Sequence, residues 1–408
     1  MSTTLFFAGL GTLLFHLITG RKVPAFLGSS FAFLGAYGLV TASGQEIPLT
    51  YSSIGVAVAG LMYLVLALLF KIFGAKKVMR FFPPIVTGPV IIAIGLTLSG
   101  TAIGSCSANW LVAIAAILVV IICNIWGKGM VKIIPILLGV VASYVVSMFV
   151  DPASREAVVT TVSEADWIGL PVIWNQTGLS IFGEGFDGGM LLTAIITIVP
   201  ISLATIVEHI GDICAISSTV GINYVADPGL HRTLVGDGLA TTVAALFGAP
   251  ANTTYGENTG VLALSKVYDP KVIRLAAVFA VVLSFCPKFA ALIVAMPAAT
   301  MGGVSLVLYG MISAVGVRNV VENQVDFTKS RNVLIAALIL VLAIGLKYGT
   351  GDVGGIAFSI GSVHITLSGL AVAALVGIFM NAVLPGKDYE FGTNEQGDTS
   401  VNFGSRAK

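Results

Sequence analysis

Carboxylates placed within long apolar runs are the residues of this sequence best suited to chemistry. Glu208, Asp212, Asp237 and Glu257 lie inside or at the edge of such runs, and Glu208 and Asp212 are four residues apart. On a helix that spacing puts both side chains on one face, about one turn apart. Two neighbouring carboxylates resist joint ionisation, so one of them should hold a proton near neutral pH. A protein that moves protons together with a substrate needs this property.

The overall composition places these carboxylates in a membrane protein. The chain has 408 residues, of which 56% are hydrophobic and only 10% are charged, and its mean hydropathy is +0.98. Globular proteins are on average roughly a quarter charged. The chain is therefore expected to be an integral membrane protein without a soluble catalytic domain. Carboxylates are costly in a bilayer, so these four should face a cavity and act on a substrate or an ion.

Each of these side chains also has a structural interpretation that stays open here. Glu208 could be a neutral, hydrogen-bonded packing residue. The adjacent His209 points to a different helix face and could be a hydrogen-bonded histidine with no further role. Asp237 lies between two glycines, where a turn or a cap is as plausible as a functional role.

Several classes of function find no support in the sequence. The four cysteines stand far apart, and none has a CxxC or Cys/His spacing that could hold a metal. A net charge of +1 does not indicate a nucleic-acid-binding protein, which would carry basic patches. No nucleophile motif indicates an enzyme, and no cofactor is expected.

Apolar runs bounded by charge, Gly or Pro predict thirteen membrane spans. The predicted spans are 3–19, 24–42, 53–73, 83–101, 108–126, 133–150, 190–213, 233–249, 251–266, 272–295, 299–317, 332–348 and 363–384. Two segments, 24–33 and 250–258, are poor helices because they are dense in Gly, Pro, Ser, Thr and Asn. Irregular backbone at membrane depth is tolerated only where protein buries it or where it lines a cavity. These two breaks therefore indicate a binding site.

Basic residues predict the orientation of the chain. Lys and Arg occupy every second connection, whereas the connection 151–189 carries six acidic residues and one Arg. By the positive-inside rule the basic connections and the tail 385–408 are cytoplasmic, and 151–189 is extracellular. A weak internal repeat accompanies this pattern: a Gly-x-Gly precedes each break, at Gly9 and at Gly236. Paired breaks in two repeats are typical of secondary transporters.

Five ordered motifs carry a family resemblance. They are VPAFLGSSFAF at 23–33, VEHIGD at 207–212, DPGLHR at 227–232, PANTTYGENTGVLALSK at 250–266 and MGGVSLVLYG at 301–310. Together they span nearly the whole chain and resemble the uracil permeases of the nucleobase/ascorbate transporter (nucleobase:cation symporter) family. The resemblance implies an all-α polytopic membrane protein with an inverted 7+7 repeat, in which the third segment of each repeat is half strand and half helix.

The resemblance also implies two domains. Residues 1–73 and 190–295 would form the core domain that binds the base, and 83–150 and 299–384 the gate domain. Family members are proton or sodium symporters and commonly dimers. The first span of this chain matches the second of the family, so the first helix of the family fold is expected to be missing, leaving about thirteen spans.

Site residues follow from the motifs that match. Glu208 and Glu257 match carboxylates that hydrogen-bond the base, Phe31 and Gly256 match positions that close on its ring, and Tyr255 lies beside them. Uracil offers two N–H donors and two carbonyl acceptors, so carboxylates and free backbone amides suit it. Glu208, Asp212 and Glu257 are the expected proton-coupling residues.

Two departures from the family pattern bear on the substrate. Uracil permeases often have His where this chain has Asp212, and the Glu/Asp spacing also occurs among xanthine and uric acid permeases. Purine permeases, however, tend to have Gln where this chain has Glu257. The sequence therefore predicts uracil import with a proton across the cell membrane, with sodium as the alternative ion. The other interpretations are a purine permease, or a non-transporting fragment because the first helix is missing.

Overall fold

Helices dominate the structure. The computed structural model describes residues 1–34, 37, 48–182, 186–351, 354–360 and 363–386, although the side chains of a few of them, Glu257 included, lie outside that description. The first half contains α1 (Ser2–Ile18), β1 (Leu27–Ser29), α3 (Leu49–Phe73), α4 (Ala75–Val78), η1 (Met79–Phe81), α5 (Pro84–Cys106), α6 (Trp110–Ile125), α7 (Met130–Ile133), α8 (Pro135–Val150) and α9 (Pro152–Glu164).

The second half begins after the connection that contains the short turns η2 (Trp174–Gln176) and η3 (Gly178–Phe182). It contains α10 (Gly188–Ile198), η4 (Val199–Ile201), α11 (Ser202–Val220), η5 (Val225–Gly229), α12 (Leu230–Leu246), β2 (Asn252–Thr254), α13 (Glu257–Ser265), α14 (Pro270–Ser284), α15 (Pro287–Val294), α16 (Ala298–Glu322), α17 (Ser330–Gly349), β3 (Gly355–Ile360), β4 (Val363–Ser368) and α18 (Gly369–Val383).

Several helices are long and apolar enough to cross a bilayer. Among the described residues these are Leu49–Phe73, Pro84–Cys106, Gly188–Ser217, Ala298–Glu322 and Ser330–Gly349. The pairs α8–α9 and α14–α15 are sharply bent, and α1, α6 and α18 are shorter apolar helices. The chain is thus a multi-pass membrane protein. The thirteen spans, the 7+7 repeat and the boundaries of the core and gate domains stay predictions.

The two segments that the sequence marked as poor helices pair with each other. Strands β1 and β2 are antiparallel, with Leu27 opposite Thr254 and Ser29 opposite Asn252. Helix α1 adds a hydrogen bond to each strand: Leu27 N donates to Thr12 Oγ1 at 2.8 Å, and the Asn252 side chain donates through Nδ2 to the Phe7 carbonyl at 2.7 Å. These bonds and the strand pairing help extended backbone to lie among the helices. The helical half expected after β1 falls largely outside the described residues.

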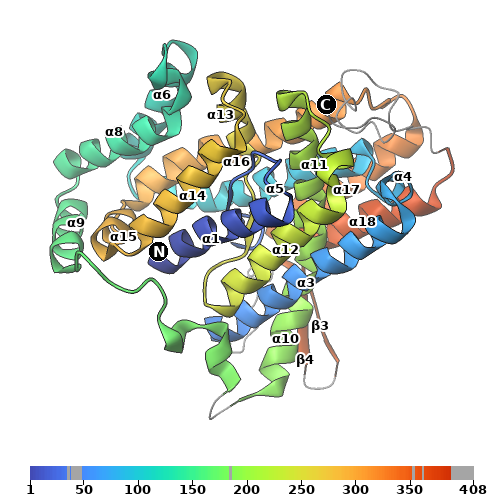
Figure 1. Cartoon of the computed structure of the whole chain (residues 1–408), viewed down its shortest axis with the longest axis horizontal. Helices are drawn as coiled ribbons and strands as arrows, with labels where there is room; N and C mark the ends of the chain where they lie inside the picture. The colour runs from blue at the N-terminus through green and yellow to red at the C-terminus, as the bar shows by residue number, and fades with distance from the viewer. Residues whose placement is uncertain (35–36, 38–47, 183–185, 352–353, 361–362, 387–408) are drawn as a thin grey trace.

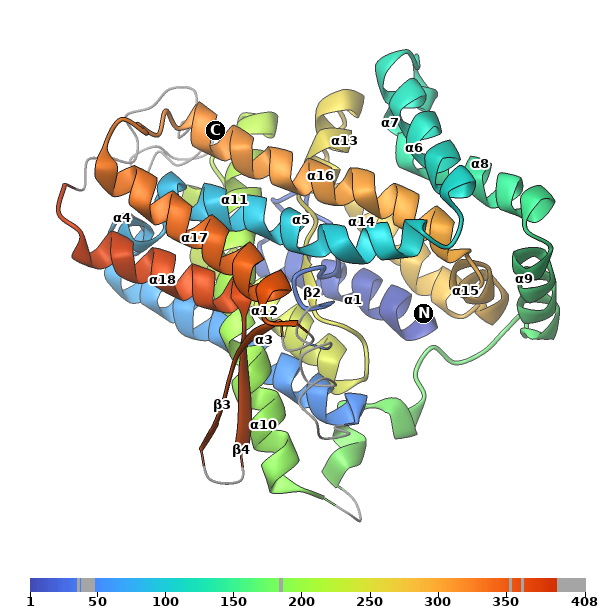
Figure 2. The same cartoon turned by 180° about the vertical axis from the view of Figure 1, so that it is seen from behind.

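Helices pack in two main groups around this strand pair (Figures 1 and 2). α12 packs against α3 and α1, and α1 also packs on α14, while α16 packs along α5, which contacts α17 in turn. α3 and α12 approach closely at two glycines, since a Cβ at Gly60 would lie 2.7 Å from the Gly238 carbonyl oxygen. Small residues at such crossings let backbones meet in dispersion contact, which holds membrane helices together.

One predicted span is corrected by the structure, and two other predicted segments are described in more detail. The span predicted at 363–384 begins with β4, which pairs with β3 as a hairpin that projects beside α10 (Figure 2). Alternation of apolar and polar residues in VHITLS favours a strand over a helix. The span predicted at 272–295 is bent by 94° between α14 and α15, because Pro287 disfavours helical backbone at the residue before it. The connection 151–189 contains the helix α9, capped by Asp151.

Candidate functional site

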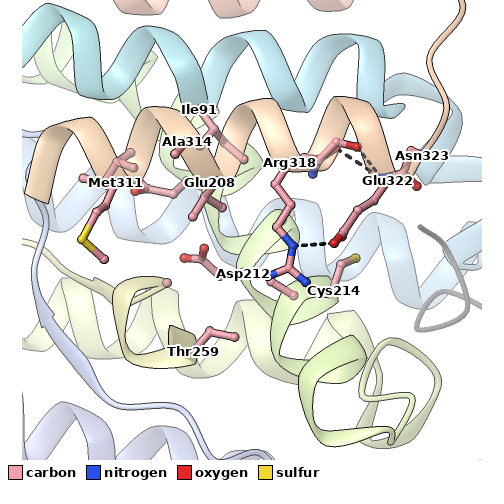
Figure 3. A pocket seen from close by; sticks show the side chains of 16 residues that line it. Ile91, Glu208, Asp212, Cys214, Thr259, Met311, Ala314, Arg318, Glu322 and Asn323 are labelled. Atoms are coloured by element: carbon pink, nitrogen blue, oxygen red, sulfur yellow. Dashed lines mark hydrogen bonds and ion pairs between the residues drawn. The ribbon is translucent and has the colours of Figure 1, made fainter. Parts of the chain in front are cut away.

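Glu208 and Asp212 lie together on α11, as their spacing predicted. Both line a cavity of about 310 Å³ (Figure 3). Another face of the same helix carries Ile206, Ile210 and Ile213, which are fully buried in the core. Burial of this apolar face fixes the rotation of α11 about its axis, and the acidic face therefore points at the cavity.

The β2–α13 connection forms the neighbouring part of the wall. Gly256 lines the cavity, and a side-chain carbon added there would collide with the Asp212 carboxylate. The VEHIGD and PANTTYGEN motifs therefore meet at this point, although they are distant in sequence. Glu257 is the first residue of α13, next to Gly256, and its side chain lies outside the described structure.

The aromatic residues predicted at the site stack on one another. The rings of Phe31 and Tyr255 are nearly parallel, at 9°, with centroids 6.5 Å apart. Tyr309 of α16 meets Phe31 edge-on, with centroids 5.3 Å apart, and the Tyr255 hydroxyl donates to the Ser29 carbonyl at 3.1 Å. Phe31 and Tyr255 are not among the residues that line the cavity, but the stack places them between the strand pair and α16.

Helix α16 supplies the opposite wall, which sequence reasoning missed. Arg318, Asn319 and Glu322 line the cavity from this side together with apolar residues of the same helix. Arg318 and Glu322 form an ion pair one helical turn apart, and Thr87 of α5 donates to Asn319 Oδ1 at 3.4 Å. The sequence placed Arg318 in a connection between spans; its spacing of four from Glu322 was the available signal for a helical pair.

A second polar cluster is buried where α11, α12 and β2 meet. His209 Nδ1 is 3.3 Å from Asp237 Oδ2 and 3.1 Å from Thr254 Oγ1, and the Thr254 hydroxyl donates to Asp237 Oδ1 at 3.3 Å. Both ionisable side chains are completely buried. Asp237 is therefore not a turn residue: it lies in the middle of α12, and His209 connects α11 to both α12 and β2.

This arrangement defines a class of protein. In this multi-pass bundle two extended segments pair next to a largely apolar cavity that carries a few charged side chains. This is the construction of a secondary transporter. The sequence model of the Permease family matches residues 1–351, and the chain belongs to this family. It is a transporter and not an enzyme.

Close relatives cover almost the whole chain. The uracil permease of Bacillus caldolyticus is 39% identical over an alignment of 396 residues, which covers 95% of this chain and 86% of that protein. The uracil permease of Escherichia coli K12 is 35% identical over an alignment of 393 residues, which covers 94% of this chain and 84% of the relative. Among solved structures, the transmembrane domain of the cyanobacterial bicarbonate transporter BicA is similar, with a TM-score of 0.52 and 15% identity over 93% of this chain and 97% of that one. That similarity concerns the fold alone.

Proposed function

We propose that this protein imports uracil together with a proton by alternating access. The observation that carries the proposal is the cavity wall in which Glu208, Asp212 and the Gly256 backbone meet. Relatives named uracil permeases over nearly the full chain support uracil as the substrate.

The chemistry of the wall suits a flat polar base. Carboxylates accept hydrogen bonds, so Glu208 and Glu257 would take the two N–H groups of uracil. The backbone N–H of Gly256 would donate to a uracil carbonyl, since the N–H groups of Asn258 and Thr259 already donate to the Tyr255 and Gly256 carbonyls. Phe31 and Tyr255 would add aromatic area at the edge of the site. A cavity of about 310 Å³ is at the small end of the range for ligand sites.

Proton coupling would depend on the two carboxylates of α11. Their spacing disfavours double ionisation, so one proton can bind or leave as the substrate site changes. Asp212 contacts the backbone beside Glu257, which would let its protonation affect the base-binding loop. Residues of α11 and α13 line one side of the cavity, and residues of α16 line the other. Movement of one side relative to the other would give alternating access.

Uptake of labelled uracil by cells without their own uracil transporter tests the substrate. Glu208→Gln should lower uptake at low uracil concentration by roughly tenfold or more, because a hydrogen bond to a charged acceptor contributes about 1.5–3 kcal/mol. The matched control is Glu156→Gln, which removes an exposed carboxylate on α9. Unchanged uptake in Glu208→Gln, or competition by xanthine stronger than by uracil, contradicts the proposal.

Proteoliposomes test the coupled ion. A pH gradient, acidic outside, should drive uracil accumulation, and Asp212→Asn should uncouple it. Accumulation driven by a sodium gradient alone would identify sodium, and not a proton, as the coupled ion.

The proposed location in the cell membrane with a cytoplasmic C-terminus is tested by protease access to a C-terminal tag. Crosslinking in membranes tests the proposed homodimer.

A further inference from the structure

A second cavity lies at the end of α3, away from the acidic site. Its volume is about 570 Å³, and it is bounded by the last turn of α3, by α4 and η1, and by the start of α12. Three positively charged side chains, one histidine and two phenylalanines form much of its lining: Lys76, Lys77, Arg80, His231, Phe70 and Phe73.

The positive charges around this cavity have no acidic partner among the described residues. The lining that the structure describes contains no acidic residue. Within the described part of the chain, Lys76, Lys77 and Arg80 make no ion pair, and the nearby Asp227 is held by Lys22 at 2.6 Å. The cavity therefore presents a positive surface that suits an anion.

The start of α12 contributes its positive dipole end and not free donors. α12 has seventeen residues and begins at Leu230, and Gly229, Leu230 and His231 line the cavity. The N–H groups of Gly229 and Leu230 already donate to the Tyr224 and Val225 carbonyls. The cavity therefore depends on its basic side chains, with the dipole of α12 as a smaller contribution.

An apolar surface leads into the cavity along α3. Val65, Leu68, Ile72 and Phe73 are each more than half exposed on this helix, which is long enough to cross a bilayer. Basic residues that follow such a helix lie at the level of the lipid headgroups, and basic pockets there bind anionic headgroups. The exposed face of α3 offers acyl chains a continuous contact, which a free phosphate ion would not use.

We propose that this cavity binds the phosphate of an anionic phospholipid whose acyl chains lie along α3. The site is independent of the proposed uracil transport, since it shares no lining residue with the acidic cavity. Lys76 and Lys77 bind the phosphate, and Phe73 contacts the glycerol and upper acyl region.

Native mass spectrometry of the full-length protein in a neutral detergent tests the site. Phosphatidylglycerol and phosphatidylcholine are added separately, and the bound fraction is measured against lipid concentration. Lys76→Gln/Lys77→Gln should weaken phosphatidylglycerol binding by roughly tenfold to thirtyfold. Each Lys near an anionic lipid surface contributes about 1 kcal/mol, and about 1.4 kcal/mol corresponds to a tenfold change in affinity. The matched control Lys128→Gln/Lys132→Gln removes two exposed positive charges elsewhere. It should leave binding within about twofold of the unaltered protein, because surface charges beyond a Debye length are screened.

Three results would overturn the proposal. Equal binding of phosphatidylcholine would show that charge does not select the lipid. Equal losses in both double variants would assign binding to general surface charge. Displacement of the lipid by millimolar inorganic phosphate, with retention of the phosphate, would identify a site for the free anion. Since both lysine pairs are exposed, the variants should fold, and size-exclusion chromatography checks this.

Discussion

Replacing Thr254 by valine should destabilise the protein, because the Thr254 hydroxyl joins two buried ionisable side chains. It donates to Asp237 Oδ1 at 3.3 Å and lies 3.1 Å from His209 Nδ1. Thr254 itself is 1% exposed, so no water replaces the lost hydroxyl. Valine keeps the shape of threonine, and the substitution therefore removes the hydrogen bonds and little else.

The size of the effect follows from that geometry. A buried polar group that loses its partner costs about 1–3 kcal/mol. Asp237 and His209 still face each other at 3.3 Å, so the total should stay within this range, about 1–3 kcal/mol. Because Thr254 ends the strand that pairs with β1, the loss should also loosen the loop that carries Gly256, and uracil uptake should fall.

Thermal unfolding in detergent measures the effect, with size-exclusion chromatography of heated samples as the readout. Thr254→Ser is the matched variant, because it keeps the hydroxyl and removes only a methyl group. We expect Thr254→Val to unfold at a temperature several degrees lower than Thr254→Ser. Equal midpoints for the two variants, or a Thr254→Val protein as stable as the unaltered chain, would refute the role assigned to the hydroxyl.

Three further predictions concern packing and the site. Gly256→Ala should reduce uracil uptake without abolishing folding, because its methyl group collides with the Asp212 carboxylate; normal uptake would show that the two need not touch. Phe31→Ala should raise the half-saturating uracil concentration roughly fivefold, since an aromatic pair contributes about 0.5–1.5 kcal/mol beyond its area; Phe31→Tyr should not. Gly60→Ala should destabilise by about 1–3 kcal/mol through overpacking between α3 and α12. Gly345→Ala, with open space around it, is the control, and thermal unfolding separates the two.

Much of the fold was predictable because the relevant signals are local. The predicted spans 53–73 and 133–150 differ from α3 and α8 by at most four residues at either end, since long apolar runs and proline boundaries are properties of single segments. Prediction failed at 363–368, where an apolar stretch with strand alternation was taken as part of a helix. Apolar content alone does not separate these two structures.

The candidate site was predictable in part for the same reason. Glu208 and Asp212 share a helix face, as their spacing required, and both line the cavity. The contribution of α16 could not be read from the sequence, because Arg318 and Glu322 looked like ordinary residues near a span end. Which helix packs opposite α11 is a matter of tertiary packing.

The sequence by itself determined that the chain is an integral membrane protein, that two segments interrupt the helical pattern and that a pair of carboxylates lies on one helix. Composition and short spacings are sufficient for these conclusions, because they depend on neighbouring residues. Only the tertiary structure decided that the two breaks pair as β1 and β2, that Gly256 abuts Asp212 and that Asp237 meets His209. Those contacts join residues far apart in the chain, and they exist only once the helices have packed.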